Sequence, residues 1–496
     1  MPEEIEAAVA DAETVRFAGY TCPFVFDEPS GKKIQHLLWG DFVGLLGPVD
    51  GEWSKVRARG ETGWMKTEEL QKNRLLELNF VDVGQGDGCF IVTPGDKPLL
   101  IDAGIGDNME RFLSWRYNLR RNPGRSITFD AAIITHPDAD HYKGFSNLVR
   151  SRQFKFKAIY HNGIVERKGD NRLGPEDEVG GVTCLTELAH DEAELRRVLE
   201  ESDFGEMPYP NLLKEALDDG PDVIKMLSSR DGHLPGYEDL DGLSIEVWGP
   251  VPEEGAGFAL RTLGDDGKTK NGHSVCLRFV YRNVKIAMGG DLNGPAETYL
   301  LNHYSEGDVE ELAGEERARA LDRARERLEA DVAKSCHHGS ADFTTSFLRA
   351  VNATATIVSS GDDEPFAHPR PDALGALGKF GRGDRPLILS TELARSSKEN
   401  IKRPFELRKE IEDLFDEREQ VTDDLQRKAL TEKIHVALAQ IERSIAVYGL
   451  INVRTDGERV VLAQKLEKPA PGGKKWDLHR LEPDAAGDLR YVTKGE

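Results

Sequence analysis

Few cysteines, no long apolar run and no basic leader set the first limits on this protein. The sequence has 5 cysteines in 496 residues, and no two of them stand in a CxxC spacing. A scattered, odd-numbered set argues against a disulfide framework and against a thiolate zinc site. No stretch of about 18 apolar residues is present, and the first residues lack the basic and then apolar layout of a secretory signal. We therefore expect a soluble, cytoplasmic protein with reduced thiols and no membrane contact.

The sequence also lacks an excess of positive charge. Its 65 lysines and arginines are outnumbered by 88 aspartates and glutamates, which gives a net charge of −23. A chain this acidic does not coat nucleic acid by general electrostatic attraction, so a polyanionic substrate would have to be attracted locally. The chain is also too long for one small core, and more than one structural unit is expected.

The clearest β pattern near the N-terminus is GEWSKVRARGETGWMKTEEL, residues 51–70. Apolar and polar positions alternate there, which predicts a small β-barrel with Trp53, Val56, Trp64 and Met65 facing inward. Together with the preceding FVGLLG, the stretch resembles bacterial Src-homology-3-like domains. The resemblance suggests a module that binds a protein partner or the neighbouring domain; the alternative is that the tryptophans only fill the barrel core.

From residue 74 onward, β-branched and apolar strands alternate with helical stretches. Two batches of strands with helices between them predict an α/β fold in which two sheets are covered by helices, an αββα sandwich. The predicted strands are 75–83, 89–93, 98–102, 131–135, 157–160, 243–248, 275–281, 284–289, 331–335, 355–359, 386–391, 449–454 and 459–465.

Four segments make up the predicted domain organisation: the N-terminal segment and barrel (1–72), the sandwich (73–395), a helical insertion (396–446), and the last strands with a C-terminal tail (447–496). Apolar residues at three- and four-residue spacing predict the helical insertion, which packs intramolecularly or makes a homodimer contact. Residues 161–240 are polar and weakly periodic, which predicts a loop-and-helix insertion. The tail after about residue 467 contains KPAPGGKK and is expected to be loosely ordered.

The stretch THPDADHYKGF, residues 135–145, directly follows the apolar run AAII. Imidazole nitrogens and carboxylate oxygens are suitable donors for divalent transition metals, and four of them in six residues can serve two adjacent ions. The alternative is a polar turn that caps the following helix. The metal interpretation uses His136, Asp138, Asp140 and His141.

Other predicted strands also end in acids or imidazoles. Asp291 follows a strand in MGGDLNGPAE, and the pair His337 and His338 follows another in AKSCHHGS. His273 stands immediately before a strand in NGHSVCLRF, and Asp102 ends a strand in LLIDAG. A site assembled along one sheet edge needs such residues at several strand ends, so coincidence explains them poorly.

The ordered set H-x-D-x-D-H, G-D and H-H-G-S resembles the metallo-β-lactamase-fold hydrolases. More narrowly, NFVDVGQGDGCFIV, LLIDAG, THPDADHYKGF, NGHSVCLRF, IAMGGDL, VAKSCHHGS, FAHPRP and INVRTDG resemble the soluble nuclease-like domain of ComEC, the competence DNA-uptake proteins. The resemblance covers about residues 74–395 and 447–465 outside the insertions, without the ComEC membrane channel. It implies a stand-alone metal-dependent hydrolase.

The resemblance also implies two divalent metal ions, Zn²⁺ or Mn²⁺. The first would be bound by His136, Asp138 and His273, and the second by Asp140, His141 and one histidine of the His337–His338 pair, with Asp291 bridging. Most family members have histidine where Asp138 stands, and an oxygen donor there makes manganese as suitable as zinc. A structural role for His273 stays open, because ComEC-like sequences commonly have N-x-x-S here without a histidine. Within the pair His338 is favoured and His337 is kept.

Three further residues are expected around the ions. Asp102 would orient a ligand from behind rather than bind metal. The glycines of VGQGDG would let the backbone pass close under the centre, with Asp87 supporting the ligand loop. His368, in FAHPRP, would donate to a phosphate oxygen or leaving group, or would be a structural histidine. Asp138, Asp140 and His368 are thus the residues expected to take part in catalysis.

Between residues 111 and 157, basic residues outnumber acidic ones, although the chain as a whole is acidic. This local reversal suits a phosphate backbone, with Arg120, Arg121 and Lys143 as the expected contacts; the alternative is a solvated helix face. We expect a metal-dependent phosphodiesterase, most favourably a DNA nuclease in which a metal-activated hydroxide attacks phosphorus in line. The alternatives are hydrolysis of a phosphocholine ester, cyclic nucleotide or lactone, and a component gated by a protein partner. A role in anti-phage defence rests on analogy.

Overall fold

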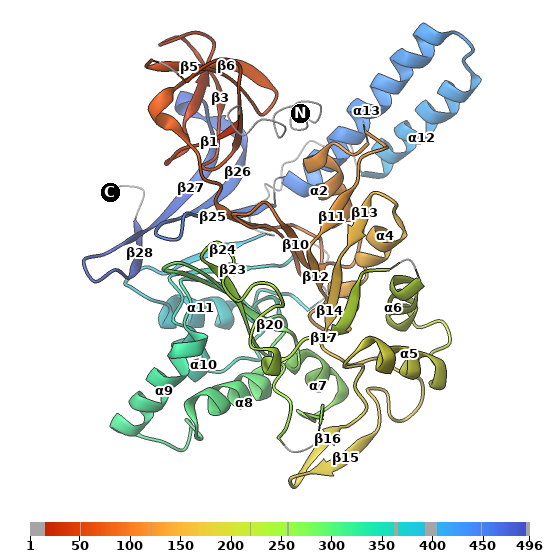
Figure 1. The fold of residues 1–496 in the computed structure, drawn as a ribbon, viewed down its shortest axis with the longest axis vertical. Coiled ribbons are helices and arrows are strands. Elements are labelled where there is room, and N and C mark those ends of the chain that lie inside the picture. Colours follow the sequence, from red (N-terminus) through yellow and green to blue (C-terminus); the bar gives the residue numbers. More distant parts are fainter. Residues whose placement is uncertain are drawn as a thin grey trace.

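The structure is a computed structural model that describes residues 15–49, 51–120, 122–218, 220–254, 257–361, 366–391, 404–447 and 449–492. At its centre two β-sheets face each other, and helices cover the outer side of each (Figure 1). The αββα sandwich predicted from the sequence is confirmed. Each strand predicted between residues 75 and 465 is present, with ends shifted by a few residues.

The first sheet has the strand order β17 (Val223–Met226), β14 (Ala158–His161), β12 (Ala131–Ile133), β10 (Pro98–Ala103), β9 (Gly88–Val92), β8 (Leu76–Phe80), β25 (Ile451–Thr455), β26 (Val460–Ala470), β27 (Lys474–Pro483), β28 (Leu489–Val492). β10, β12, β14 and β17 run parallel, so their carboxyl ends share one edge. On β9, Cys89 and Ile91 face the second sheet while Phe90 and Val92 face the outer helices. This alternation buries both faces of the strand.

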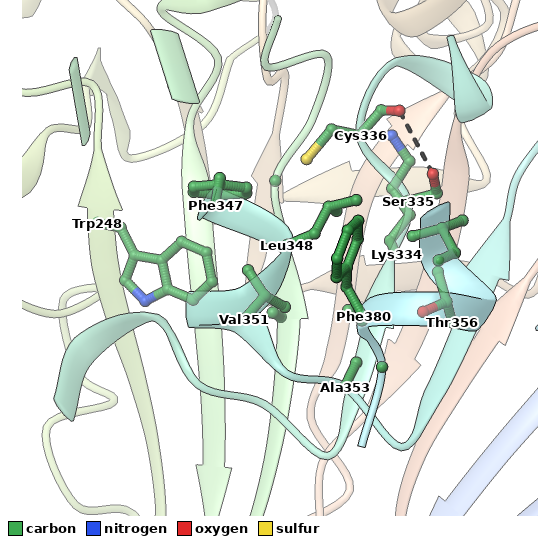
Figure 2. A pocket seen from close by; sticks show the side chains of 15 residues that line it. Trp248, Lys334, Ser335, Cys336, Phe347, Leu348, Val351, Ala353, Thr356 and Phe380 are labelled. Atoms are coloured by element: carbon green, nitrogen blue, oxygen red, sulfur yellow. Dashed lines mark hydrogen bonds between the residues drawn. The ribbon is translucent and has the colours of Figure 1, made fainter. Parts of the chain in front are cut away.

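The second sheet has the order β18 (Leu243–Gly249), β20 (Cys276–Tyr281), β21 (Val284–Met288), β22 (Val332–Lys334), β23 (Ala355–Val358), β24 (Leu387–Ser390). Its outer face is covered by α8 (Gly294–Ser305), α9 (Gly314–Leu328), α10 (Thr345–Val351) and α11 (Pro371–Phe380). A pocket between this face and its helices is lined by Trp248, Phe347 and Phe380 (Figure 2). Ala333 borders that pocket, and its neighbour Lys334 sends its ammonium to the other face of β22.

The helices outside the first sheet are α2 (Asn108–Tyr117), α3 (Ala139–Tyr142), α4 (Phe145–Arg150), α5 (Glu192–Glu201) and α6 (Pro208–Asp218). Short strands β11 (Ile127–Phe129) and β13 (Phe154–Phe156) form a separate pair, and β15 (Glu176–Val179), β16 (Val182–Leu185) and β19 (Leu260–Arg261) form another small sheet before α7 (Asp266–Gly272). The prediction that residues 161–240 form only loops and helices is wrong, because β17 extends the first sheet. Its mixture of Val, Ile, Lys and Met is too short to give a clear strand pattern.

The N-terminal unit is a seven-stranded sheet made of β1 (Val15–Ala18), β2 (Phe24–Phe26), β3 (Lys33–His36), β4 (Phe42–Leu45), β5 (Trp53–Ala58), β6 (Glu61–Lys66) and β7 (Leu70–Gln71). Val56 and Met65 are fully buried in its core, as the alternation predicts. Trp53 and Trp64 are only half-buried, and Trp53 packs edge-on against Phe26. The inward position expected for these tryptophans is therefore wrong.

Charged side chains join this unit to the first sheet. Arg454 of β25 donates to the carbonyl oxygen of Trp39 at 2.7 Å and to Asp41 at 2.9 Å, and it also contacts Glu77 at 3.3 Å. Arg59 pairs with Asp41, and Arg116 pairs with Glu77 at 3.0 Å. We call Asp41, Arg59, Glu77, Arg116 and Arg454 the arginine–carboxylate interface.

The tail predicted to be loose is instead structured. β27 pairs along β26, and the KPAPGGKK segment forms their connection. Trp476 of β27 packs with Trp39 and Cys22 of the N-terminal unit, which buries the hairpin on one side. The predicted helical insertion is a hairpin of α12 (Pro404–Gln420) and α13 (Asp424–Val447), which projects from the body beside α2 (Figure 1). Among the described residues, no helix has the length and apolarity needed to cross a lipid bilayer.

Candidate metal centre

The residues predicted to bind metal come from the carboxyl ends of strands in both sheets. Asp102 ends β10, the H-x-D-x-D-H turn follows β12, and Asp291 follows β21. His337 and His338 follow β22 in a tight turn where both residues have positive φ, 47° and 52°. Because the two sheets face each other, these strand ends meet at one edge of the sandwich.

Four of the predicted ligands lie close together. The Nε2 atoms of His141 and His338 lie 3.3 Å apart, and Asp291 Oδ2 lies 3.2 Å from the first and 3.0 Å from the second. Asp140 completes the set at 3.6 Å from His338 Nε2 and 4.0 Å from His141 Nε2. Ligands about 2.0–2.1 Å from a tetrahedral ion stand about 3.3 Å from one another. The separations among His141, His338 and Asp291 therefore fit a divalent ion, and Asp140 groups with the two histidines. We call these four residues the tetrahedral set.

Carboxylates behind the tetrahedral set orient its imidazoles. Asp102 accepts from His141 Nδ1 at 2.8 Å and from the backbone NH of Thr135 at 2.8 Å. His338 Nδ1 lies 3.0 Å from the carbonyl oxygen of Ser359 and 3.2 Å from Asp87 Oδ1. In both histidines Nδ1 is held from behind, so Nε2 points into the set. These positions agree with the supporting roles expected for Asp102 and Asp87.

The electrostatics of this region favour positive charge. Burial works to lower the pKa of His338, but Asp291 and Asp87 raise it to about 10. Burial also works to lower the pKa of His141, but Asp291 and Asp102 raise it well above its ordinary value. Burial raises the pKa of Asp291, yet His141, His338 and Lys334 bring it well below its usual range. A cavity that stabilises imidazolium in this way also attracts a metal cation.

The glycines of the VGQGDG loop allow it to pass directly under the metal-ligand turn. Gly86 has φ +90°, and a Cβ there would lie 1.8 Å from the carbonyl oxygen of Asp140. The next backbone NH, of Asp87, donates to that same carbonyl at 3.2 Å. A side chain at Gly86 would therefore push the loop away from the turn.

The other half of the predicted centre is arranged differently. His136 Nε2 is buried without a hydrogen-bond partner and lies 3.4 Å from Asp138 Oδ2. Asp138 also forms an ion pair with Lys270, and Lys270 reaches Glu166 at 2.8 Å. Burial raises the pKa of Asp138, but His136 and Lys270 bring it below its usual range. Asp138 thus has a fixed cation of the chain as its partner.

His273 does not join the other candidates. Its Nε2 donates to the carbonyl oxygen of Arg261 at 2.7 Å, and burial lowers its pKa to about 4. Among the described residues, the groups of three or more side chains able to hold an ion include neither His273 nor Asp138 nor His337. The placement supports the structural alternative for His273 over the ligand role. Ser274, which follows it, lies 3.3 Å from His136 Nδ1.

His337 and His368 lie beside the centre, and both are partly exposed. The ring of His337 lies 5.6 Å from that of His368, and its Nε2 is 4.0 Å from Asp291 Oδ2. Burial and the neighbouring histidines lower the pKa of His368 to about 4. Phe366, which is 67% exposed, stacks on His368 at 6.0 Å. His368 is thus placed beside the centre, and its ring is neutral.

The residues predicted to contact phosphate do not lie together in the structure. Arg120 follows α2, before β11 and β12 begin, and therefore lies near the amino edge of the parallel strands. The side chain of Gln153 bonds the carbonyls of Leu119 and Arg125, which places the 151–155 segment there as well. The metal candidates lie at the opposite, carboxyl edge, so a contact of Arg120 with a phosphate at the centre is not supported. Arg121 lies outside the described residues.

Several other basic residues of the 111–157 region have carboxylate partners. The pairs are Arg111 with Asp107, Arg116 with Glu77, Arg150 with Glu215, and Lys157 with Asp130. Lys143, which ends the α3 turn beside the metal candidates, is exposed. Of the three predicted contacts, Lys143 is the one at the carboxyl edge.

Sequence reasoning missed two lysines at the centre. Lys334 is buried between the sheets, pairs with Asp87, lies 3.5 Å from Asp291 Oδ1 and donates to the carbonyl oxygen of Gly290 at 2.7 Å. A lysine at the end of a predicted strand, directly before the turn that carries His337 and His338, was the available signal for it. Lys270 had no such signal, because it stands in a polar stretch.

The chain was compared with known proteins. Residues 84–361 match the model of the Metallo-beta-lactamase superfamily. The fold is similar to a diphosphatase from the PhnP family, at 12% identity over 62% of this chain and 94% of that chain, with a TM-score of 0.28. It is also similar to a variant of the CmlA beta-hydroxylase, at 12% identity over 64% of this chain and 52% of that chain, with a TM-score of 0.30. No curated protein matches the chain. Because the family match spans more than half of the 496 residues, the chain belongs to the metallo-beta-lactamase superfamily.

Proposed function

We propose that this protein is a metal-dependent phosphodiesterase whose substrate is DNA, with Zn²⁺ or Mn²⁺ as its ion. The observation that carries the hydrolase part is the tetrahedral set, in which two imidazoles and two carboxylates converge with separations of 3.0 to 4.0 Å. A divalent ion held there supplies an activated water and neutralises charge on the attacked phosphate. The similarity to the ComEC nuclease-like domain suggests DNA as the substrate.

The protein's own side chains would perform three tasks around that ion. Asp140 and Asp291 bind it, while Asp102 and Asp87 keep the imidazoles of His141 and His338 in the required orientation. His368 has its pKa lowered to about 4, so it is neutral near neutral pH and can donate one hydrogen bond to a phosphate oxygen.

The rim of the centre suits a nucleotide better than a small uncharged ester. Lys143 and Arg370 are exposed near the opening, and each can pair with a backbone phosphate. Phe366 offers an exposed ring on which an unpaired base can stack, a contact that favours single-stranded substrates. A lactone, which carries neither a phosphate nor a base, would use neither feature.

The test is cleavage of single- and double-stranded DNA by purified protein that has been stripped of metal and then loaded with Zn²⁺ or Mn²⁺. Asp140→Asn should abolish cleavage because it removes an anionic ligand with little change in shape. Asp342→Asn, which changes an acid outside the tetrahedral set, is the control and should leave cleavage intact. Hydrolysis of a lactone or a cyclic nucleotide in preference to DNA would replace the proposed substrate.

A protein partner could gate this activity, as expected from the added N-terminal unit, which we propose to be an Src-homology-3-like module. The helical hairpin is a second candidate surface, since Leu425 is 80% exposed on α13. If the loaded protein is inactive alone but cleaves DNA when a partner is supplied, the gated form of the proposal is supported, as would suit a defence effector.

A further inference from the structure

We infer that this chain holds a single divalent ion tightly, in the tetrahedral set, and that the ammonium of Lys270 takes the place of the second ion of a two-metal centre. The inference rests on the metal-binding part of the proposed function and concerns the number of ions, not the substrate. It rests on how the two halves of the centre are occupied by side chains.

The half around His136 has too few free ligands for a second ion. His273, the third ligand expected there, is bonded to the carbonyl oxygen of Arg261. Asp291 turns Oδ2 toward His141 and His338, while its Oδ1 faces Lys334 at 3.5 Å. His136 Nε2 has no hydrogen-bond partner, and the group of described side chains it could join to hold an ion is completed by His141 and Asp291, which both belong to the tetrahedral set. One imidazole of its own and two ligands shared with the other ion make a weak site, because tight structural and catalytic sites use at least three protein ligands.

Lys270 already supplies the positive charge that Asp138 needs. Its side chain is 14% exposed and its ammonium pairs with both Asp138 and Glu166. With its amide oriented so that nitrogen faces acceptors, Asn271 donates to Asp138 Oδ2 at 2.6 Å. A divalent ion bound by Asp138 would lie next to this ammonium, and two cations at that separation repel strongly in a partly buried site.

The helix that carries Lys270 fixes the position of its side chain. Lys270 stands on α7, whose N-terminal residue Asp265 caps the helix through the backbone NH of Lys268. The helix therefore fixes the position of Lys270 beside the turn that carries Asp138. Such a fixed cation can neutralise an acid permanently, which a dissociable ion cannot.

Metal stoichiometry tests the inference. Metal-free protein would be equilibrated with Zn²⁺ or Mn²⁺, passed over a desalting column and assayed by elemental analysis. We expect about one ion per chain for the wild type and about two for Lys270→Met, because this variant frees Asp138 to join His136. Lys268→Met, on the same helix but paired with Asp342, is the matched control and should keep about one ion.

Two further variants make the result independent of how well Lys270→Met folds. In Lys270→Met, Glu166 also loses its cation. The double variant Glu166→Gln with Lys270→Met removes this second unpaired carboxylate, and it should also bind about two ions. Asp138→Asn should leave the wild-type count unchanged, whereas Asp140→Asn should lower it. Two tightly held ions in the wild type, one of them lost in Asp138→Asn, would overturn the inference. A count near one ion in both Lys270→Met and the double variant would also overturn it. A count of one together with no cleavage of DNA would leave this inference standing and count against the proposed function.

Discussion

Two clusters of buried charge lie in this molecule, and they differ in how their charges are matched. In the arginine–carboxylate interface, Asp41 and Glu77 both contact Arg454, and each has a further arginine of its own. In the metal centre, carboxylates and imidazoles face one another across 3.0 to 4.0 Å. The interface is complete with the chain's own groups, whereas the tetrahedral set becomes complete only with an added cation.

The pKa values show the same difference. Burial works to raise the pKa of Asp41, but Arg59 and Arg454 lower it to about 2, and the charged state needs nothing else. In the metal centre, the pKa of Asp291 is lowered first by protonated His141 and His338 and then by Lys334, so most of the partners of this carboxylate are themselves titratable. A buried charge with a permanent partner stabilises a fixed contact, while a charge that depends on protons or ions forms a binding site.

The largest expected effect comes from removing a ligand of the tetrahedral set. His338→Ala should weaken binding of the ion by more than about 100-fold, because the supporting contacts alone are worth 10- to 100-fold. Isothermal titration calorimetry of the metal-free protein would measure this. His273→Ala is the comparison: it removes a buried hydrogen bond and should cost about 1–3 kcal/mol of stability with no change in metal affinity. A loss of metal affinity in His273→Ala would restore this residue as a ligand.

The next effect concerns the interface. Arg454→Met removes the arginine shared by Asp41 and Glu77 and should lower the free energy of unfolding by about 3 kcal/mol, since it leaves buried carboxylates short of a partner. Urea denaturation would measure it. Arg490→Met, which breaks a half-exposed pair with Asp484, should cost less than about 1 kcal/mol. If the two variants were equally stable, the interface would be no more than a surface contact.

Glu297 is a buried carboxyl that belongs to neither cluster. Burial raises its pKa to about 8, and it accepts a hydrogen bond from the backbone NH of Thr344 at 2.5 Å. Because the folded state binds this proton more tightly than the unfolded state, its contribution is greatest at low pH and is lost as pH rises through about 8. Glu297→Gln should therefore be more stable than wild type by roughly 2 kcal/mol at about pH 9 and similar to it below about pH 5. Chemical denaturation at both pH values measures this, and a wild-type stability that rises toward alkaline pH would contradict it.

The smallest expected effect is at the rim. Lys143→Ala should weaken DNA binding by about 1 kcal/mol or less and reduce the slope of log affinity against log salt by about 1, because one phosphate contact is lost. Fluorescence anisotropy with a labelled oligonucleotide over a salt series would show it. Lys155→Ala, at the amino edge of the parallel strands, should change neither quantity. Equal effects of the two lysines would mean that DNA contacts the molecule away from the centre.

Most strands of the sandwich and the four residues of the tetrahedral set could be predicted from the sequence pattern. Strands such as 89–93 and 284–289 were predictable because they are mostly apolar runs bordered by a glycine, Gly88 before the first and Gly289 at the end of the second. Asp140, His141, Asp291 and His338 were predictable because each stands just after a strand, and strand ends of a parallel sheet meet at one edge. Local pattern and chain order are sufficient for such inferences.

The pairing of each cation with its acid follows from the three-dimensional arrangement and not from the sequence pattern. The tertiary structure placed Lys270 on Asp138, turned His273 toward Arg261, and moved Arg120 to the edge opposite the centre. It also ordered the tail after residue 467 by packing Trp476 against Trp39 of the N-terminal unit. These outcomes depend on contacts between segments far apart in the chain, and electrostatic pairing acts over a few ångströms in space, a distance that spacing along the sequence does not encode.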